Sequence, residues 1–300
     1  MEVPGGENDL PAPILPQELE RAIFELAAYS CPPNIPIFML TAWRVKHWLE
    51  PLLYRVACIY AIPDEDHRFP VVSADVLLRA IANKRSCLLH AVEYFFLGDP
   101  PTSSESSIVD DFLSACPRIT HLFSSGSLVI HSTLEAVASL HCLHRLTLDS
   151  TKISQSLTSF AHPLFRNVTH LELLDIDSIT DIDNSQYASL ALVPNLTHIS
   201  FNYTPLFCEV YPLLANIAQL QCIVLLSMLF RRQQSMPDPR PLDDRFVHIG
   251  QTDFFIEWLN SAHGRRDYWG IAEALISARR SGRVPPSLYS VSDVDMSWRA

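Results

Sequence analysis

Few residues of this 300-residue chain have the types and spacing that a catalytic or metal site requires. An acidic run from Asp175 to Asp183 begins like a calcium loop, which needs a further oxygen ligand, a glycine and a glutamate at fixed positions. Those positions hold Ile179, Thr180 and Gln186. The run is better interpreted as a turn whose aspartates accept backbone N–H groups and cap the next helix.

Other reactive groups also lack partners at useful spacing. His141, Cys142 and His144 place donor atoms close together, but no second pair of ligands follows at zinc-finger spacing. The chain has no GxSxG elbow, none of its seven cysteines has a catalytic context, and its eight glycines form no phosphate-binding loop. We therefore expect no enzyme activity, no metal site and no cofactor.

A regular pattern does occur in the middle of the chain. Six segments share the spacing apolar-x-x-apolar-x-apolar, and their first residues lie 24 to 28 positions apart, at Val92, Ile119, Leu143, Val168, Leu196 and Leu220. This period is typical of leucine-rich repeats. Helical patterns lie between the segments, at 73–84, 106–115, 133–140 and 209–218. The pattern predicts an α/β fold built from strand-turn-helix units with a parallel sheet. We expect the solenoid to be irregular, because the Asn or Cys that usually stands in the turn of each repeat is absent.

Side chains on either side of the second apolar position are expected to point outward along one face of that sheet. We call them the ladder: Tyr94, His121, Arg145, His170, His198 and Cys222 before it, and Phe96, Phe123, Thr147, Glu172, Ser200 and Val224 after it. Such a surface suits an acidic or partly hydrophobic peptide or protein, and its histidines would make binding sensitive to pH. The alternative is that His and Thr are merely tolerated at half-exposed strand positions. The predicted substrate-binding residues are Tyr94, Phe96, His121, Phe123, Arg145, His170, Glu172 and His198.

Residues 14–60 form a separate, helix-rich module in this interpretation. Pro16 is suited to a first helical turn, and the next apolar residues fall on one helical stripe: Leu19, Ala22, Ile23, Leu26 and Ala27. A second helical stretch ends at Pro51, and residues 52–56 tend toward β-structure. The apolar stripe of Leu15, Leu19, Ile23 and Leu26, together with Trp48, either packs onto the first repeat or leaves an apolar patch for a partner protein.

The rest of the chain divides by composition. Residues 1–13 are predicted to be a disordered tail, 61–235 the repeats, 236–283 a C-terminal cap and 284–300 a loose tail. The cap contains a last strand at 245–249 and two amphipathic helices, 252–260 and 267–281, the second ending at Gly282. An open stack of repeats needs such a cap at its end.

Charge and composition limit the partners. The net charge is −11 and only three lysines occur, so we expect binding to neither nucleic acid nor a membrane surface. The most apolar stretch, 217–230, is too short to span a bilayer. The seven cysteines are scattered, which is typical of reduced thiols, and the acidic N-terminus does not resemble a secretory signal. We therefore expect a soluble intracellular protein, cytoplasmic or nuclear.

The N-terminal module resembles the F-box, a helical module that opens with Leu-Pro and an amphipathic helix. The stretches that carry the resemblance are ILPQELERAIFELAAY and WRVKHWLEPLLYRV, in which Leu15-Pro16, Glu18-Leu19, Ile23-Phe24, Trp48 and Leu53-Tyr54-Arg55 match. Nearly all of 14–283 also resembles a set of mushroom-type (basidiomycete) fungal proteins. These have an F-box-like start, irregular leucine-rich-like repeats and a terminal segment that corresponds to 244–282.

This resemblance implies a non-enzymatic substrate-recognition subunit of an SCF-type ubiquitin ligase. The residues expected to contact a Skp-type adaptor, or to support that surface, are Leu15, Pro16, Leu19, Ile23 and Trp48. The ladder would hold an unknown substrate protein near the ligase and so raise its local concentration. The alternative is a repeat interaction scaffold unrelated to ubiquitin, in which the F-box-like helices only cap the solenoid.

Overall fold

The computed structural model describes residues 15–59, 72–98, 106–124, 131–150, 157, 159–174, 184–202, 204–228, 243–251, 254–262, 267–295 and 297–299. Nine strands form one sheet in which every neighbouring pair is parallel and the spatial order equals the sequence order. They are β1 Val56–Ile59, β2 Tyr94–Leu97, β3 His121–Ser124, β4 Arg145–Asp149, β5 His170–Leu174, β6 His198–Phe201, β7 Cys222–Met228, β8 Phe246–Gln251 and β9 Ser290–Ser292. The predicted α/β class with a parallel sheet is confirmed.

The repeating apolar spacing also sets the register of the sheet. The second apolar residues of the six segments lie opposite one another on β2 to β7: Phe95, Leu122, Leu146, Leu171, Ile199 and Ile223. Because side chains alternate along a strand, these residues and their neighbours two positions later share one face. All the ladder residues therefore lie on the other face, as predicted.

Helices cover the first face and complete its core. They are α4 Ala74–Ala82, α5 Ser86–Leu89, α6 Ser106–Ala115, α7 His131–Ala138, the 3₁₀ segments η4 Pro163–Phe165 and η5 Asn184–Leu192, and α9 Thr204–Leu214. Their apolar side chains, among them Leu77, Phe112 and Phe207, join the sheet residues in one continuous buried cluster. The predicted helices are confirmed, except that α9 begins at Thr204, before the expected 209–218.

Polar side chains link successive units at the entry to β5, β6 and β7. The side-chain amides of Asn167, Asn195 and Gln219 donate to the backbone carbonyls of His141, Arg166 and Val193, at 3.1, 2.8 and 2.8 Å. These bonds satisfy carbonyls in the turn of the preceding unit, so they replace the turn Asn or Cys that the repeats lack.

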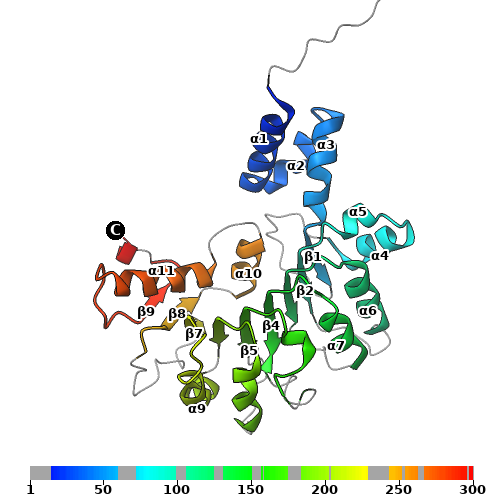
Figure 1. Ribbon diagram of the computed structural model, residues 1–300. Helices are drawn as coiled ribbons and strands as arrows, with labels where there is room; N and C mark the ends of the chain where they lie inside the picture. The colour runs from blue at the N-terminus through cyan, green and yellow to red at the C-terminus, as the bar shows by residue number, and fades with distance from the viewer. Residues whose placement is uncertain are drawn as a thin grey trace, which may run out of the picture.

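The N-terminal helices project from the β1 end of the sheet (Figure 1). They are α1 Gln17–Ser30, α2 Ile35–Phe38 and α3 Trp43–Leu49, with 3₁₀ turns η1 Pro32–Asn34 and η2 Glu50–Tyr54. None of the helices in the described ranges has the length and apolar composition needed to cross a bilayer.

The C-terminal part includes α10 Phe254–Ala262, α11 Tyr268–Arg280, β9 and the short η6 Ser297–Arg299. Strands β8 and β9 continue the sheet at the end of the stack, whereas α10 and α11 lie over the ladder face. We call α10 and α11 the C-terminal cover. Side chains of α11 share a buried cluster with Cys222, Val224 and Val247, and side chains of α10 share another with Val56 and Phe96. Helices therefore lie over both faces of the sheet (Figure 1).

Two further boundaries differ from the sequence prediction. Residues 52–54, expected to tend toward β-structure, complete a 3₁₀ turn, and β1, which falls inside the predicted helical module, pairs with β2. Strand β9 lies within the predicted loose tail and pairs with β8, so β8 is not the last strand. The helix end expected at Gly282 is confirmed by its left-handed φ of 73°.

Phe207 tests the packing of the helical face. Its ring lies 5.9 Å from that of Phe201 on β6 and 5.3 Å from that of Phe246 on β8, and the side chain is fully buried. We expect Phe207→Ala to lower the free energy of unfolding by about 3–5 kcal/mol in urea denaturation. The exposed control Leu192→Ala should stay within about 0.5 kcal/mol of wild type. A loss below about 1 kcal/mol for Phe207→Ala would contradict this packing.

Candidate functional site

The first candidate surface is an apolar face of α1. Leu15, Leu19, Ile23 and Leu26 are 44%, 54%, 54% and 68% exposed, and Pro16 is exposed beside them. We call these four leucine and isoleucine side chains the apolar face of α1. Of the two alternatives for the predicted stripe, the structure shows the one in which it remains free.

The N-terminal helices have a separate core of their own. Ala28, Ile35, Val45 and Leu49 are buried together, with Phe24 and Trp48 partly buried against them. Trp48 thus supports the helices rather than lying on the apolar face of α1. Outside this core, the Arg44 guanidinium donates to both carboxylate oxygens of Glu20, at 2.7 and 2.9 Å, and ties α3 to α1.

Arg55 joins the N-terminal helices to the sheet. Its Nε donates to Glu93 at 2.8 Å, and its guanidinium carbon lies 5.3 Å from the ring centre of Tyr29 and 5.1 Å from that of Tyr94. Tyr29 lies in the last turn of α1, and Tyr94 is the first residue of β2. The Arg55 cation therefore contacts one aromatic ring on the N-terminal helices and one on the sheet.

The second candidate surface is the ladder, and its aromatic end is covered by α10. The rings of Phe96 and Phe123 stack 4.3 Å apart, and those of Tyr94 and His121 stack 4.1 Å apart. Trp258 meets Tyr94, Phe96 and Phe123 edge-on at 6.0, 5.5 and 6.2 Å. Edge-to-face contacts of this kind each add about 0.5–1.5 kcal/mol beyond the area they bury.

The histidine end of the ladder is covered by α11. The imidazoles of His170 and His198 stack 4.0 Å apart, and the ring of Trp269 lies edge-on to both, at 5.1 and 5.6 Å. His198 Nε2 lies 3.0 Å from a carboxylate oxygen of Glu273. Burial lowers the pKa of His170 to about 2, and burial together with the nearby Arg145 lowers that of His121 to about 3.

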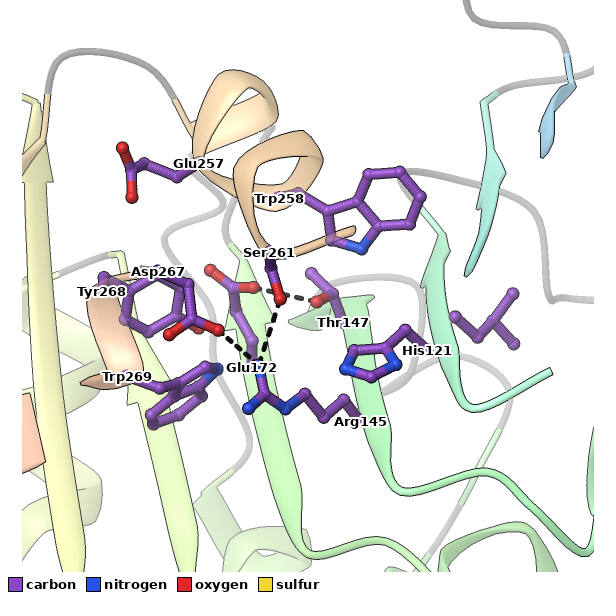
Figure 2. Close-up of a pocket in the computed structure, with 11 residues that line it drawn as sticks. His121, Arg145, Thr147, Glu172, Glu257, Trp258, Ser261, Asp267, Tyr268 and Trp269 are labelled. Carbon is purple, nitrogen blue, oxygen red and sulfur yellow. Dashed lines mark hydrogen bonds and ion pairs between the residues drawn. The ribbon is translucent and has the colours of Figure 1, made fainter. Parts of the chain in front are cut away.

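A charged contact fixes the C-terminal cover between these two ends. Figure 2 shows the Arg145 guanidinium reaching from β4 to the carboxylate of Asp267, with which it forms a close ion pair, and to Ser261 Oγ at 3.2 Å. Asp267 also accepts from the backbone N–H of Gly270 at 2.9 Å and so caps the start of α11. The same carboxylate therefore begins the helix and attaches it to the sheet.

Glu172 is buried beneath this contact. Its carboxylate accepts from Thr147 Oγ1 at 2.8 Å (Figure 2), and the nearby Tyr268 hydroxyl lies 3.1 Å from Ser200 Oγ. Burial raises the pKa of Glu172 to about 7, against the hydrogen bonds from Thr147 and Tyr268, which favour the ionised form. The ladder thus holds a carboxyl group that changes its charge near neutral pH.

The pocket between the ladder and the C-terminal cover is small. It is lined by side chains that include Arg145, Glu172 and Trp269, and its volume is about 30 Å³. Since a water molecule needs at least about 10–15 Å³, the pocket has room for roughly two water molecules and for no metabolite. Among the described residues, the pocket between the ladder and the C-terminal cover is thus too small for a substrate molecule.

The expected exposure of the ladder is therefore wrong, although its membership is right. Of the predicted substrate-binding residues, Tyr94, Phe96, Phe123, Glu172 and His198 are buried, and His121, Arg145 and His170 are half-buried. A signal for the cover was present, because VEYFFL and CIVLL are almost continuously apolar, as in parallel strands buried on both faces. Residues 175–183, considered above for calcium, lie outside the described residues.

Comparison with known proteins adds no further assignment. No model of a known protein family matches the chain, and no curated protein matches it in sequence. The two candidate surfaces must therefore be judged on their chemistry.

The raised pKa of Glu172 gives a stability test. The folded state favours the protonated acid, so its contribution is fully present below about pH 4.5 and is lost as the pH rises through about 7. Glu172→Gln stays neutral. The stability of the variant relative to wild type should therefore rise by about 2 kcal/mol between pH 5 and pH 8, measured by urea denaturation at both values. A difference that does not change with pH would contradict the burial of this carboxyl group.

His121 titrates in the opposite sense. Its folded pKa of about 3 lies below the unfolded value, so the stability it contributes is present above about pH 6.5 and is lost as the pH falls. His121→Phe retains a ring against Tyr94 but cannot take up a proton. Between pH 7 and pH 5, wild type should lose about 1–2 kcal/mol more stability than the variant. Parallel losses in the two proteins would show that His121 is open to water.

Proposed function

We propose that this chain is a non-enzymatic substrate-recognition subunit of an SCF-type ubiquitin ligase. In this proposal α1 to α3 act as an F-box-like module that docks on a Skp-type adaptor, and the rest of the chain receives a substrate protein. Such a protein works in the cytoplasm or the nucleus and brings its substrate close to the catalytic partners of the ligase.

The apolar face of α1 is the observation that carries the proposal. Four large apolar side chains lie exposed on one side of α1. The core of the N-terminal helices uses other side chains of α1, those of Phe24 and Ala28. Exposed apolar side chains that lie next to one another, rather than singly, are typical of a surface that another protein covers. The module also projects away from the sheet, so an adaptor can reach it without touching the ladder (Figure 1).

The architecture agrees with the second half of the proposal. We assign the parallel strands and their covering helices to an irregular leucine-rich-repeat-like solenoid, on the grounds that strand order follows the sequence and the apolar spacing recurs in register. The small volume of the pocket favours recognition of a protein over catalysis on a small molecule.

A substrate that binds the ladder directly has to displace the C-terminal cover. The reason is that the cover contacts the aromatic rings, Arg145 and the histidines of the ladder. The ladder and the C-terminal cover would then be two states of one recognition surface. A substrate that binds instead to the outer surface of the C-terminal cover would need no such rearrangement.

Adaptor binding tests the proposal. The full chain should co-purify with a fungal Skp-type adaptor, and Leu19→Asp combined with Ile23→Asp should weaken the complex at least about 100-fold, because two anchoring side chains at an apolar interface are replaced by charges. Leu192→Asp is the matched control, since Leu192 is 61% exposed on η5, outside the N-terminal helices. The affinities are measured by calorimetry, after circular dichroism has shown that each variant is folded.

Two results would overturn the proposal. If folded wild-type protein does not bind the adaptor, the chain is instead a repeat scaffold unrelated to ubiquitin, whose N-terminal helices cap the solenoid. If the double variant binds as tightly as wild type, any adaptor contact lies outside the apolar face of α1.

A further inference from the structure

Two histidines and a glutamate meet where α11 crosses the sheet. His170 on β5 and His198 on β6 lie opposite each other in the parallel register. Trp269 and Glu273 are one helical turn apart on α11, so both lie over the two imidazoles. The possible ligand atoms of His170, His198 and Glu273 all lie within 4.8 Å of one another.

Each imidazole is held at Nδ1 by the threonine that precedes it. Thr169 Oγ1 lies 2.9 Å from Nδ1 of His170, and Thr197 Oγ1 lies 2.7 Å from Nδ1 of His198. Each hydroxyl also has a backbone carbonyl at 3.2 Å, that of His144 or of Thr169. When the hydroxyl donates to that carbonyl, it accepts from Nδ1–H, and Nε2 of the neutral ring then carries a lone pair. In His198 this lone pair faces the Glu273 carboxylate oxygen, 3.0 Å away.

This arrangement is the one that metal-binding histidines use. One ring nitrogen is fixed by a hydrogen bond to a protein oxygen, which sets the tautomer and the ring direction, and the other nitrogen binds the ion. The guanidinium of Arg145, which also lies under the C-terminal cover, is paired with Asp267.

We propose that His170, His198 and Glu273 bind a zinc-type divalent ion between the ladder and the C-terminal cover. Two imidazole nitrogens and a carboxylate oxygen, with a water as the fourth ligand, suit Zn²⁺ better than Mg²⁺ or Ca²⁺, which prefer oxygen ligands. Ligands of a tetrahedral zinc are about 3.3 Å apart. His198 Nε2 and the Glu273 oxygen are 3.0 Å apart and all three groups lie within 4.8 Å of one another, so binding needs only small shifts. The side chain of Glu273 is 56% exposed, which leaves room for such a shift.

The ion would join the sheet to α11. Because two ligands come from the ladder and one from the C-terminal cover, metal binding stabilises the covered state over an open one. Sequence reasoning placed His170 and His198 on one face of the sheet but did not predict this site, because its carboxylate comes from the distant helix α11. The proposal does not depend on the ligase assignment.

Zinc titration of the full chain tests the site. Metal is first removed with a chelator, and the exposed thiols Cys31, Cys87 and Cys208 are alkylated so that they cannot take the ion. Calorimetry should then show one Zn²⁺ per chain with a micromolar or lower Kd. Co²⁺ in place of zinc should give the visible absorption of a four-coordinate nitrogen–oxygen site without sulfur charge-transfer bands.

Two variants test the ligands, and a third serves as the control. Glu273→Gln removes an exposed carboxylate, and His170→Phe keeps a ring against His198 and Trp269. Each should weaken zinc binding by at least the roughly 10- to 100-fold that losing an outer hydrogen-bond partner costs a metal site. His121→Phe is the matched control, because Thr120 and His121 form the same threonine–histidine pair but, among the described residues, His121 belongs to no group of three possible metal ligands. This variant should bind zinc as wild type does.

Either of two results would overturn the proposed site. If wild-type protein binds no zinc under these conditions, or if Glu273→Gln and His170→Phe bind it as tightly as wild type, the three residues form only a hydrogen-bonded contact between α11 and the sheet. Circular dichroism confirms that each variant compared is folded.

Discussion

A parallel sheet with apolar side chains on both faces has to be covered on both faces, and this requirement determines how the molecule is built. The repeating spacing directs Phe95, Leu122 and their equivalents to the side of α4 to α9, and the same alternation directs Phe96, Phe123 and Val224 to the opposite side. If that second face were open to water, several large apolar groups would be solvated. The C-terminal cover removes them from water, with Trp258 on the aromatic end and Trp269 on the histidine end.

The covered face is nevertheless not uniformly apolar. An ion pair from Arg145 to Asp267, a carboxyl group at Glu172 and two stacked imidazoles lie beneath the C-terminal cover. Polar groups enclosed in this way contribute to specificity of packing more than to stability, and their contributions depend on protonation. The side chains that were expected to bind an acidic or partly hydrophobic partner are thus kept within the molecule, whereas the apolar face of α1 stays outside. In the proposed function, adaptor docking and substrate binding would therefore use separate surfaces.

Sequence reasoning succeeded where a pattern repeats and failed where a contact joins distant parts of the chain. Strand positions, register and ladder membership followed from the period-two alternation and the recurrence of 24 to 28 residues. The start of α1 followed from Pro16 and the apolar spacing. The placement of α10 and α11 did not, because an amphipathic helix after a repeat stack fits an end cap and a face cover equally well. The meeting of His198 with Glu273 depends entirely on that placement. The aromatic ladder positions were the available clue, and they were interpreted as a binding surface instead of a buried one.

Thiol alkylation tests the covered state most directly, because the chain carries its own reporters. Cys58 and Cys222 lie on the ladder face under α10 and α11, Cys116 lies in the core on the opposite face, and Cys31, Cys87 and Cys208 are exposed. Native protein treated briefly with N-ethylmaleimide and mapped by mass spectrometry should be modified at the three exposed cysteines. Cys58 and Cys222 should be as protected as Cys116, because burial excludes the reagent and raises the pKa of their thiols. Modification of Cys58 and Cys222 at the rate of the exposed cysteines, while Cys116 stays protected, would show that the ladder face is open in solution.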